Sequence, residues 1–367
     1  MPVYMDLHIV PGISAKDAAQ AHYEDLKVQD QYGCKCMTYW VDENRESAFC
    51  LIEAPDKEAV IQMHNKAHSL IPHEIIQVDS KIVEAFLGRI HDPTFFSELI
   101  NPEIKIFNDP AFRIILICKT LDLQFAYMKF GNDKAKQIVN EFKNIFKTTI
   151  ESFNGSEVKF RNDLNIGSFV SVSQALKCAL SLNRNLNLSK DLTDFKISLH
   201  AGTPVEGSES IFGSTIQFAE DLCLVSSRSK VILSPLIKDL CMDNNDMTFN
   251  TETELKCVTI EEEQTLKLLM KVLRTYYLNP NFDGTFFCES IGMSKSNLYR
   301  KCISLTGFSP NNLIRNYRLA QSIFLLNKRY NISQTAFDCG FSSPSYFTKC
   351  FQKRFGIQPY NFRKAIT

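Results

Sequence analysis

The chain lacks the patterns that mark exported and membrane proteins. No apolar run approaches the roughly 20 residues needed to cross a bilayer, and the N-terminal segment has neither the basic start nor the apolar core of a signal peptide. The twelve cysteines are scattered without a CxxC pair, so we expect reduced thiols rather than disulfides. These absences predict a cytoplasmic protein with no membrane partner.

The composition is that of a globular protein with more than one domain. The 367 residues are 44% apolar and 22% charged, and such a length fits two or three cores. Alternating apolar patterns predict an α+β domain at 1–80, a linker at 81–109 and a second α+β domain at 110–241. A second linker is expected at 242–262 and an all-α domain at 263–367. The first domain reads βαββαβ, which implies a ferredoxin-like sheet with both helices on one face.

The net charge of zero hides an asymmetry along the chain. From Thr265 onward eight lysines and seven arginines face only Asp283, Glu289 and Asp338, which gives +12 and leaves −12 for the preceding residues. A balance of this kind over about a hundred residues is typical of a nucleic-acid binder. A basic domain that docks onto an acidic one would show the same asymmetry.

The basic segment contains an internal repeat. The stretches "SIGMSKSNLYRKCISLTGFSP" and "DCGFSSPSYFTKCFQKRFGIQP" share their glycine, serine, cysteine and proline positions, as two copies of a helix-turn-helix unit would. Ser294 caps the second helix of the first copy, and Ser343 with Pro344 does so in the second. The residues expected to face the core are Leu298, Cys302, Phe347 and Phe351. The candidates for major-groove contact are Lys295, Ser296, Asn297, Arg300, Ser345, Tyr346, Lys349 and Lys353.

This segment resembles the DNA-binding domain of AraC/XylS-type transcription regulators. The resemblance rests on "RLAQSIFLLNKRYNISQTAFDCGFSSPSYFTKCFQKRFGIQPYNFRK". It implies two recognition helices in successive major-groove turns of double-stranded DNA, joined by a linker helix at about 310–327. Arg363 and Lys364 then suit phosphate contacts, which position the protein without reading sequence.

Residues 110–241 resemble the class III adenylate/guanylate cyclase domain in "NDLNIGSFVSVSQALKCAL", "ISLHAGTPV" and "FGSTIQFAEDL". The family uses two metal-binding aspartates, an asparagine and an arginine. Here Asp163 matches one aspartate, Asp122 is out of register for the other, and Gln217 and Asp221 replace the asparagine and the arginine. A carboxylate in place of the cation reverses the charge that phosphoryl chemistry needs. We therefore expect a non-catalytic domain, and the alternative is a signalling nucleotidyl cyclase with regulatory DNA- and metal-binding domains.

Histidines gather in "MHNKAHSLIPH" near the end of the first domain. Two of them are spaced i, i+4 on one helix face, a spacing that can close on one cation. The first domain also resembles small ferredoxin-like domains described as nickel-binding, through "MPVYMDLH", "AHYEDL" and "YGCKCMTYWVDENRESAFCLIEAPDKEAV". The expected cofactor is nickel or another imidazole-preferring divalent metal. The candidate ligands are His8, His22, His64, His68, His73 and Cys50.

Other interpretations of these residues stay open. His64 and His68 are also typical of an ordinary helix end, where positive charge is favourable, and His8 lies on the side of its strand opposite the apolar residues. That side would then be an open sheet surface or a dimer contact. Cys34 and Cys36 are candidates for redox sensing. With all parts together, the sequence predicts a metal-responsive transcription regulator, not an enzyme, that forms a homodimer through exposed sheet faces or edges; metal storage is a weaker alternative.

Overall fold

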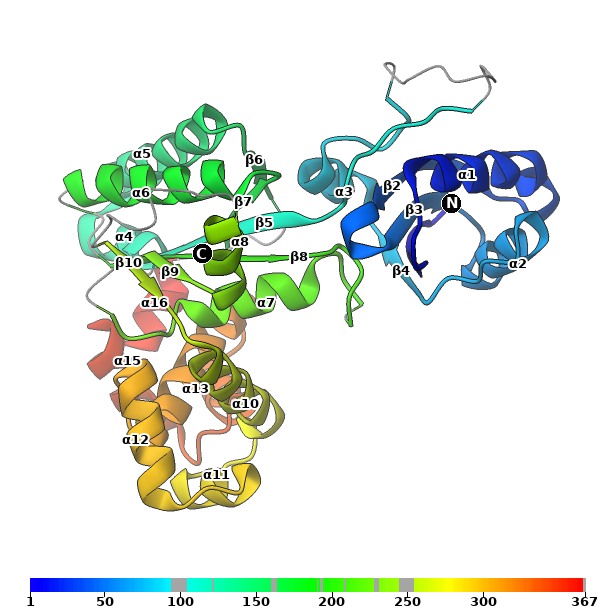
Figure 1. Ribbon diagram of the computed structural model, residues 1–367. Helices are drawn as coiled ribbons and strands as arrows, with labels where there is room; N and C mark the ends of the chain where they lie inside the picture. The colour runs from blue at the N-terminus through cyan, green and yellow to red at the C-terminus, as the bar shows by residue number, and fades with distance from the viewer. Residues whose placement is uncertain are drawn as a thin grey trace.

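The protein is described by a computed structural model, shown in Figure 1. The described residues are 1–93, 104–120, 122–159, 164–189, 191, 194–207, 209–227, 231–243 and 254–365. They form two sheet-containing parts followed by a helical part, which confirms the predicted α+β class with an all-α C-terminal region. Among these residues no helix is both long and apolar enough to span a membrane.

The N-terminal part is a four-stranded antiparallel sheet in the order β2-β3-β1-β4. Its elements are β1 (Val3–Ile9), α1 (Ala15–Val28), β2 (Lys35–Asp42), β3 (Ser47–Glu53), α2 (Lys57–Ala67) and β4 (Glu74–Val78). Ser14 and Asp17 form a capping box at the start of α1, and Asp56 caps α2 by accepting from the Ala59 backbone N–H. These caps fix where the two helices begin on the same face of the sheet, as the βαββαβ pattern predicts.

Both faces of this sheet are covered. Tyr4 and Ile52 pack under α1 and α2 with Met63, whereas Met5 and Trp40 on the opposite face pack against helix α3 (Ser80–Leu87) and the second part. The expectation that the side of Tyr4, Asp6 and His8 is an open surface is therefore wrong. That side is the helix-covered one, and the apolar side has its own partner.

The middle part is a six-stranded sheet in the order β10-β9-β8-β5-β7-β6. Its elements are β5 (Arg113–Thr120), α4 (Asp122–Phe130), α5 (Asn132–Ser152), β6 (Ser156–Val158), β7 (Asn165–Phe169), α6 (Val172–Leu188), β8 (Phe195–Gly202), α7 (Gly213–Leu222), β9 (Val231–Leu233), α8 (Pro235–Asp243) and β10 (Leu255–Cys257). Helices α5, α6 and α8 bury one face and α7 covers the other. Helix α3 and strand β10 lie in segments expected to be linkers. Helix α3 is ordered because its apolar side chains pack against the N-terminal sheet, and β10 because it pairs with β9 at the edge of the second sheet.

The described residues of the C-terminal part form helices after β10. They are α10 (Ile260–Tyr276), α11 (Gly284–Ile291), α12 (Lys295–Thr306), α13 (Pro310–Asn327), α14 (Ile332–Asp338), α15 (Pro344–Phe355) and α16 (Pro359–Ala365). Ser294 and Ser343 cap α12 and α15 through their hydroxyls, as expected. The Arg318 guanidinium on α13 donates to the carbonyls of Tyr277 and Asn279 at 2.8 and 2.6 Å, which ties α13 to the segment between α10 and α11.

Candidate metal centre and nucleic-acid interface

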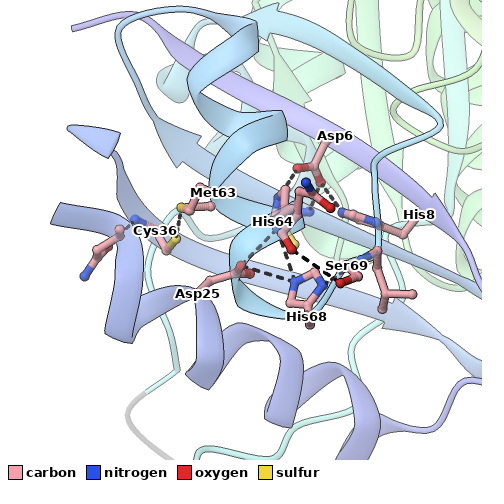
Figure 2. A network of polar contacts seen from close by, with 12 residues as sticks. Asp6, His8, Asp25, Cys36, Met63, His64, His68 and Ser69 are labelled. Atoms are coloured by element: carbon pink, nitrogen blue, oxygen red, sulfur yellow. Dashed lines mark hydrogen bonds and ion pairs between the residues drawn. The ribbon is translucent and has the colours of Figure 1, made fainter. Parts of the chain in front are cut away.

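A polar cluster is buried where α2 crosses β1 and α1 (Figure 2). Its centre is His64, whose side chain is fully buried. The Nε2 atom of His64 lies 2.8 Å from Oδ2 of Asp6, and its Nδ1 atom lies 3.0 Å from Oδ1 of Asp25. A single imidazole thus bridges two carboxylates that come from different elements.

His68 extends this cluster toward the surface at the end of α2. Its Nε2 atom lies 3.2 Å from Oδ1 of Asp25 and 3.3 Å from Nδ1 of His64. Its Nδ1 atom accepts a hydrogen bond of 3.2 Å from the Leu70 backbone N–H, so Nε2 is the atom that faces the cluster. The side chain is 12% exposed. Asp25, His64 and His68 therefore form a triangle of donor atoms at the rim of the cluster.

His8 and Cys50 stand on the inner side of the same cluster. The Nε2 atom of His8 lies 3.5 Å from Oδ1 of Asp6, and it is buried with no hydrogen-bond partner among the described residues. The Cys50 backbone N–H donates to Oδ1 of Asp6 at 2.9 Å. Potential ligand atoms of Asp6, His8, Cys50 and His64 all lie within 4.8 Å of one another. The inner side thus offers a second donor set that shares His64 with the rim.

The electrostatics of the cluster follow from its burial and its pairing. Although burial raises the pKa of the Asp6 carboxyl, the imidazoles of His8 and His64 hold that pKa well below its usual range. For Asp25, burial also raises the pKa, and hydrogen bonds from His64 and His68 lower it further than burial raises it. Burial lowers the pKa of His64, but Asp6 and Asp25 raise it to about 10. Without a metal, His64 is therefore a cation between two anions.

The donor atoms fit a divalent metal ion. Atoms bonded to one ion at about 2.1 Å lie roughly 3.0 to 3.4 Å apart at octahedral or tetrahedral angles. The triangle of Asp25, His64 and His68 has edges of 3.0, 3.2 and 3.3 Å. In the inner donor set, the buried His8 nitrogen has no hydrogen-bond partner among the described residues, which leaves it available as a ligand atom. Imidazole with carboxylate and thiol donors suits nickel, zinc and copper better than calcium or magnesium.

The structure brings together some of the predicted ligands and separates others. His8, His64, His68 and Cys50 meet in the cluster. His22 instead lies beside Asp92, at 3.8 Å. His73 accepts from the Ile9 backbone N–H at 3.1 Å, outside both donor sets.

Asp6 and Asp25 were missed by the sequence reasoning. The available signal was spacing, because Asp6 precedes His8 by two positions on one strand face and Asp25 follows His22 by three on one helix face.

The surroundings of His64, Cys34 and Cys36 disfavour the other interpretations of these residues. A helix-end role does not explain His64, because both of its nitrogens contact buried carboxylates. Burial raises the pKa of the Cys34 thiol to about 11, and it raises that of Cys36 still further. The thiolate is the reactive form in redox chemistry. The environment of this pair therefore disfavours redox sensing.

The outer surfaces of α12 and α15 carry the predicted DNA-contacting side chains. Lys295, Ser296, Arg300, Ser345, Tyr346, Lys349 and Lys353 are exposed, and Asn297 and Arg363 are half-buried. On the opposite sides Leu298, Cys302, Phe347 and Phe351 are buried, as expected. Both recognition helices thus present polar and basic residues outward while their apolar residues form the cores of the two units.

The cyclase-like positions of the middle part do not form a catalytic set among the described residues. Asp163 lies outside the described residues, and Asp122 begins helix α4. Gln217 is exposed on α7, whereas Asp221 is buried and accepts a hydrogen bond from the Arg274 guanidinium of α10. Burial raises the pKa of Asp221 to about 6, although Arg274 lowers it in part. Asp221 therefore points at the C-terminal part of the chain.

Two protein families match parts of the chain. Residues 287–365 match the family described as a helix-turn-helix domain, and residues 4–78 match the family described as nickel responsive protein SCO4226-like. The C-terminal region is therefore an AraC-type domain, and the N-terminal region is a domain of the nickel-responsive SCO4226-like family. Neither match covers residues 110–241.

Individual relatives are similar over limited stretches. Histidine kinase P4 of Formosa agariphila is 37% identical over 118 residues, 32% of this chain and 8% of that protein. The HTH-type transcriptional activator RhaS of Mannheimia succiniciproducens is 35% identical over 92 residues, 24% of this chain and 34% of that protein. The matched stretches thus span 8% and 34% of these two curated relatives. A solved bacterial light-regulated adenylyl cyclase is 15% identical with a TM-score of 0.30, covering 65% of this chain and 86% of that one. The cyclase resemblance stays a prediction.

Proposed function

We propose that this chain is a DNA-binding transcription regulator whose N-terminal domain responds to nickel or another imidazole-preferring divalent cation. The observation that carries the DNA-binding part is the pair of capped helices α12 and α15, each with a buried apolar side and an exposed polar or basic side. The +12 charge of this region supports contact with phosphates. The match to a helix-turn-helix family supports the same function.

The metal-responsive part is supported by the buried cluster. Asp25, His64 and His68 would hold the ion at the rim, and Asp6, His8 and Cys50 supply the inner donors. A divalent ion bound at the rim would supply positive charge beside Asp25, where the protonated Nδ1 of His64 otherwise lies. Because a ligand nitrogen must be deprotonated, binding of the ion would displace a proton from His64, and the affinity for metal would rise with pH.

A metal response requires two states of the protein that differ in affinity for the metal. Ligand binding shifts DNA affinity only if the metal favours the DNA-competent or the incompetent state. The cluster joins β1, α1 and α2, so an ion there would link three elements of one sheet domain. A coupling of about 2.7 kcal/mol changes DNA affinity by two orders of magnitude.

We further propose that the middle part is not catalytic. The pairing of Asp221 with Arg274 supports this, because the carboxylate at the position of a catalytic cation is already engaged. The signalling nucleotidyl cyclase remains the rival function. Formation of cyclic nucleotide from ATP or GTP with Mg²⁺ or Mn²⁺ by the full chain would establish the rival instead.

Duplex DNA selected by the full chain from a randomised pool tests the DNA-binding function. We expect Arg300→Ala or Lys349→Ala to weaken binding to the selected duplex by about 1–3 kcal/mol if the side chain reaches a base edge. Lys147→Ala on the distant surface of α5 is the matched control, since this lysine is exposed. Failure of the wild-type chain to enrich any duplex would contradict the proposed function.

The expected homodimer also remains a proposal. Both faces of the N-terminal sheet are covered within one chain, so a second copy would have to meet another surface. Light scattering on the full chain, with and without Ni²⁺, measures the mass directly. A monomer under both conditions would rule the dimer out.

A further inference from the structure

The first helix-turn-helix unit, with helices α10 to α12, and the second, with helices α14 to α16, each contact the middle part. Phe218 and Leu222 of α7 belong to the core of the first unit together with Leu273, and the Ser226 backbone N–H donates to the Leu305 carbonyl at 2.7 Å. Helix α4 meets the second unit. The cores of both units therefore include side chains from outside the basic segment.

The contact at the second unit includes one buried aromatic ring of α4, and Met128 of the same helix packs against the same cluster. Phe125 of α4 is 2% exposed and lies within the cluster formed by the second unit. Its ring centroid is 4.9 Å from that of Phe355, at the end of α15, and 5.1 Å from that of Phe362 on α16. Phe125 thus fills a slot between the recognition helix and the last helix.

Helix α16 needs such support. It has only seven residues, and isolated helices of this length are not stable in water. Its buried aromatic anchor is Phe362, which contacts Phe125 and, at 6.0 Å, Phe351. The next two residues, Arg363 and Lys364, are the predicted phosphate contacts. Any loosening of α16 therefore moves these two cations.

We propose that Phe125, a residue of the middle part, is a positioning residue for DNA binding, which it supports by holding α16 so that Arg363 and Lys364 meet the phosphate backbone. This inference rests on the proposed DNA-binding function. Phe125 does not touch the nucleic acid, and it acts by ordering the helix that does. The DNA-binding unit consequently extends beyond the all-α segment that the sequence predicts.

The test uses the full chain and a fluorescent 30-base-pair duplex of mixed sequence, titrated by anisotropy between 50 and 200 mM KCl. Each phosphate contact contributes roughly 0.9 to the slope of log affinity against log salt. We expect Phe125→Ala to weaken binding about tenfold and to lower the slope by about one to two. Tyr127→Ala, an exposed residue of the same helix, should leave affinity and slope unchanged.

A double-mutant cycle separates positioning from general stability. Arg363→Ala with Lys364→Ala should weaken binding in the wild-type background but cause little further loss in the Phe125→Ala background. If Phe125→Ala does not fold, Phe125→Leu, which keeps an apolar side chain and removes the ring, should give a smaller loss with the same non-additivity.

Two outcomes overturn the inference while the proposed function stands. One is wild-type affinity and slope in both Phe125 variants, and the other is full additivity with the α16 changes. No binding by the wild-type chain would instead contradict the proposed function itself.

Discussion

Replacing His64 with alanine should strongly destabilise the metal-free N-terminal domain. The change leaves Asp6 and Asp25, each 1% exposed, facing a cavity without the imidazolium that both contact. Breaking a buried ion pair by removing one partner costs about 3–5 kcal/mol. The rise in the pKa of His64 from 6.5 to about 10 corresponds to a similar figure, roughly 5 kcal/mol. We expect a loss in this range.

The pH dependence of this effect has a definite sign. Because folding raises the pKa of His64, its stabilising contribution is fully present below the unfolded value near 6.5 and is lost as the pH rises toward 10. The stability difference between wild type and His64→Ala should therefore be large near pH 6 and smaller near pH 9.5.

The only tryptophan of the chain provides the assay. Trp40 is fully buried in the N-terminal sheet, so its emission follows the unfolding of this domain in urea with EDTA present. His91→Ala, a change at an exposed histidine, is the control and should behave as wild type. A His64→Ala loss under 1 kcal/mol at pH 6, or one that does not shrink at pH 9.5, would refute the buried ion-pair reasoning.

Three further expectations concern the other sites. His68→Ala should weaken Ni²⁺ binding, measured by calorimetry, at least about tenfold. It should change stability little, because His68 lies at the rim of the cluster. An affinity equal to that of the His91→Ala control would remove His68 from the ligand set. The Asp221→Arg variant should form no cyclic nucleotide, and turnover in a product assay would contradict this. Its melting temperature should fall, because the change places a second cation beside Arg274, at a cost of about 3–5 kcal/mol. Cys34 should react slowly with iodoacetamide at pH 7.5, because burial raises its pKa to about 11; modification within minutes, followed by mass spectrometry of the native chain, would reopen the redox interpretation.

Local patterns in the sequence were sufficient for much of the architecture. Ser294 and Ser343 caps, the apolar spacing in α12 and α15, and the strand alternation of the first domain are short-range features. Such features depend on backbone periodicity and on hydrogen bonds between near neighbours. The helix-turn-helix repeat was readable for the same reason.

Only the tertiary structure decided which side chains meet. His64 contacts Asp25 across 39 positions and Asp6 across 58, so the packing of α2 over β1 and α1 selects these partners and leaves His73 outside. Phe125 likewise reaches its slot through the docking of two distant segments. No local pattern encodes such pairs, because they depend on how whole elements pack and not on the spacing of residues within one element.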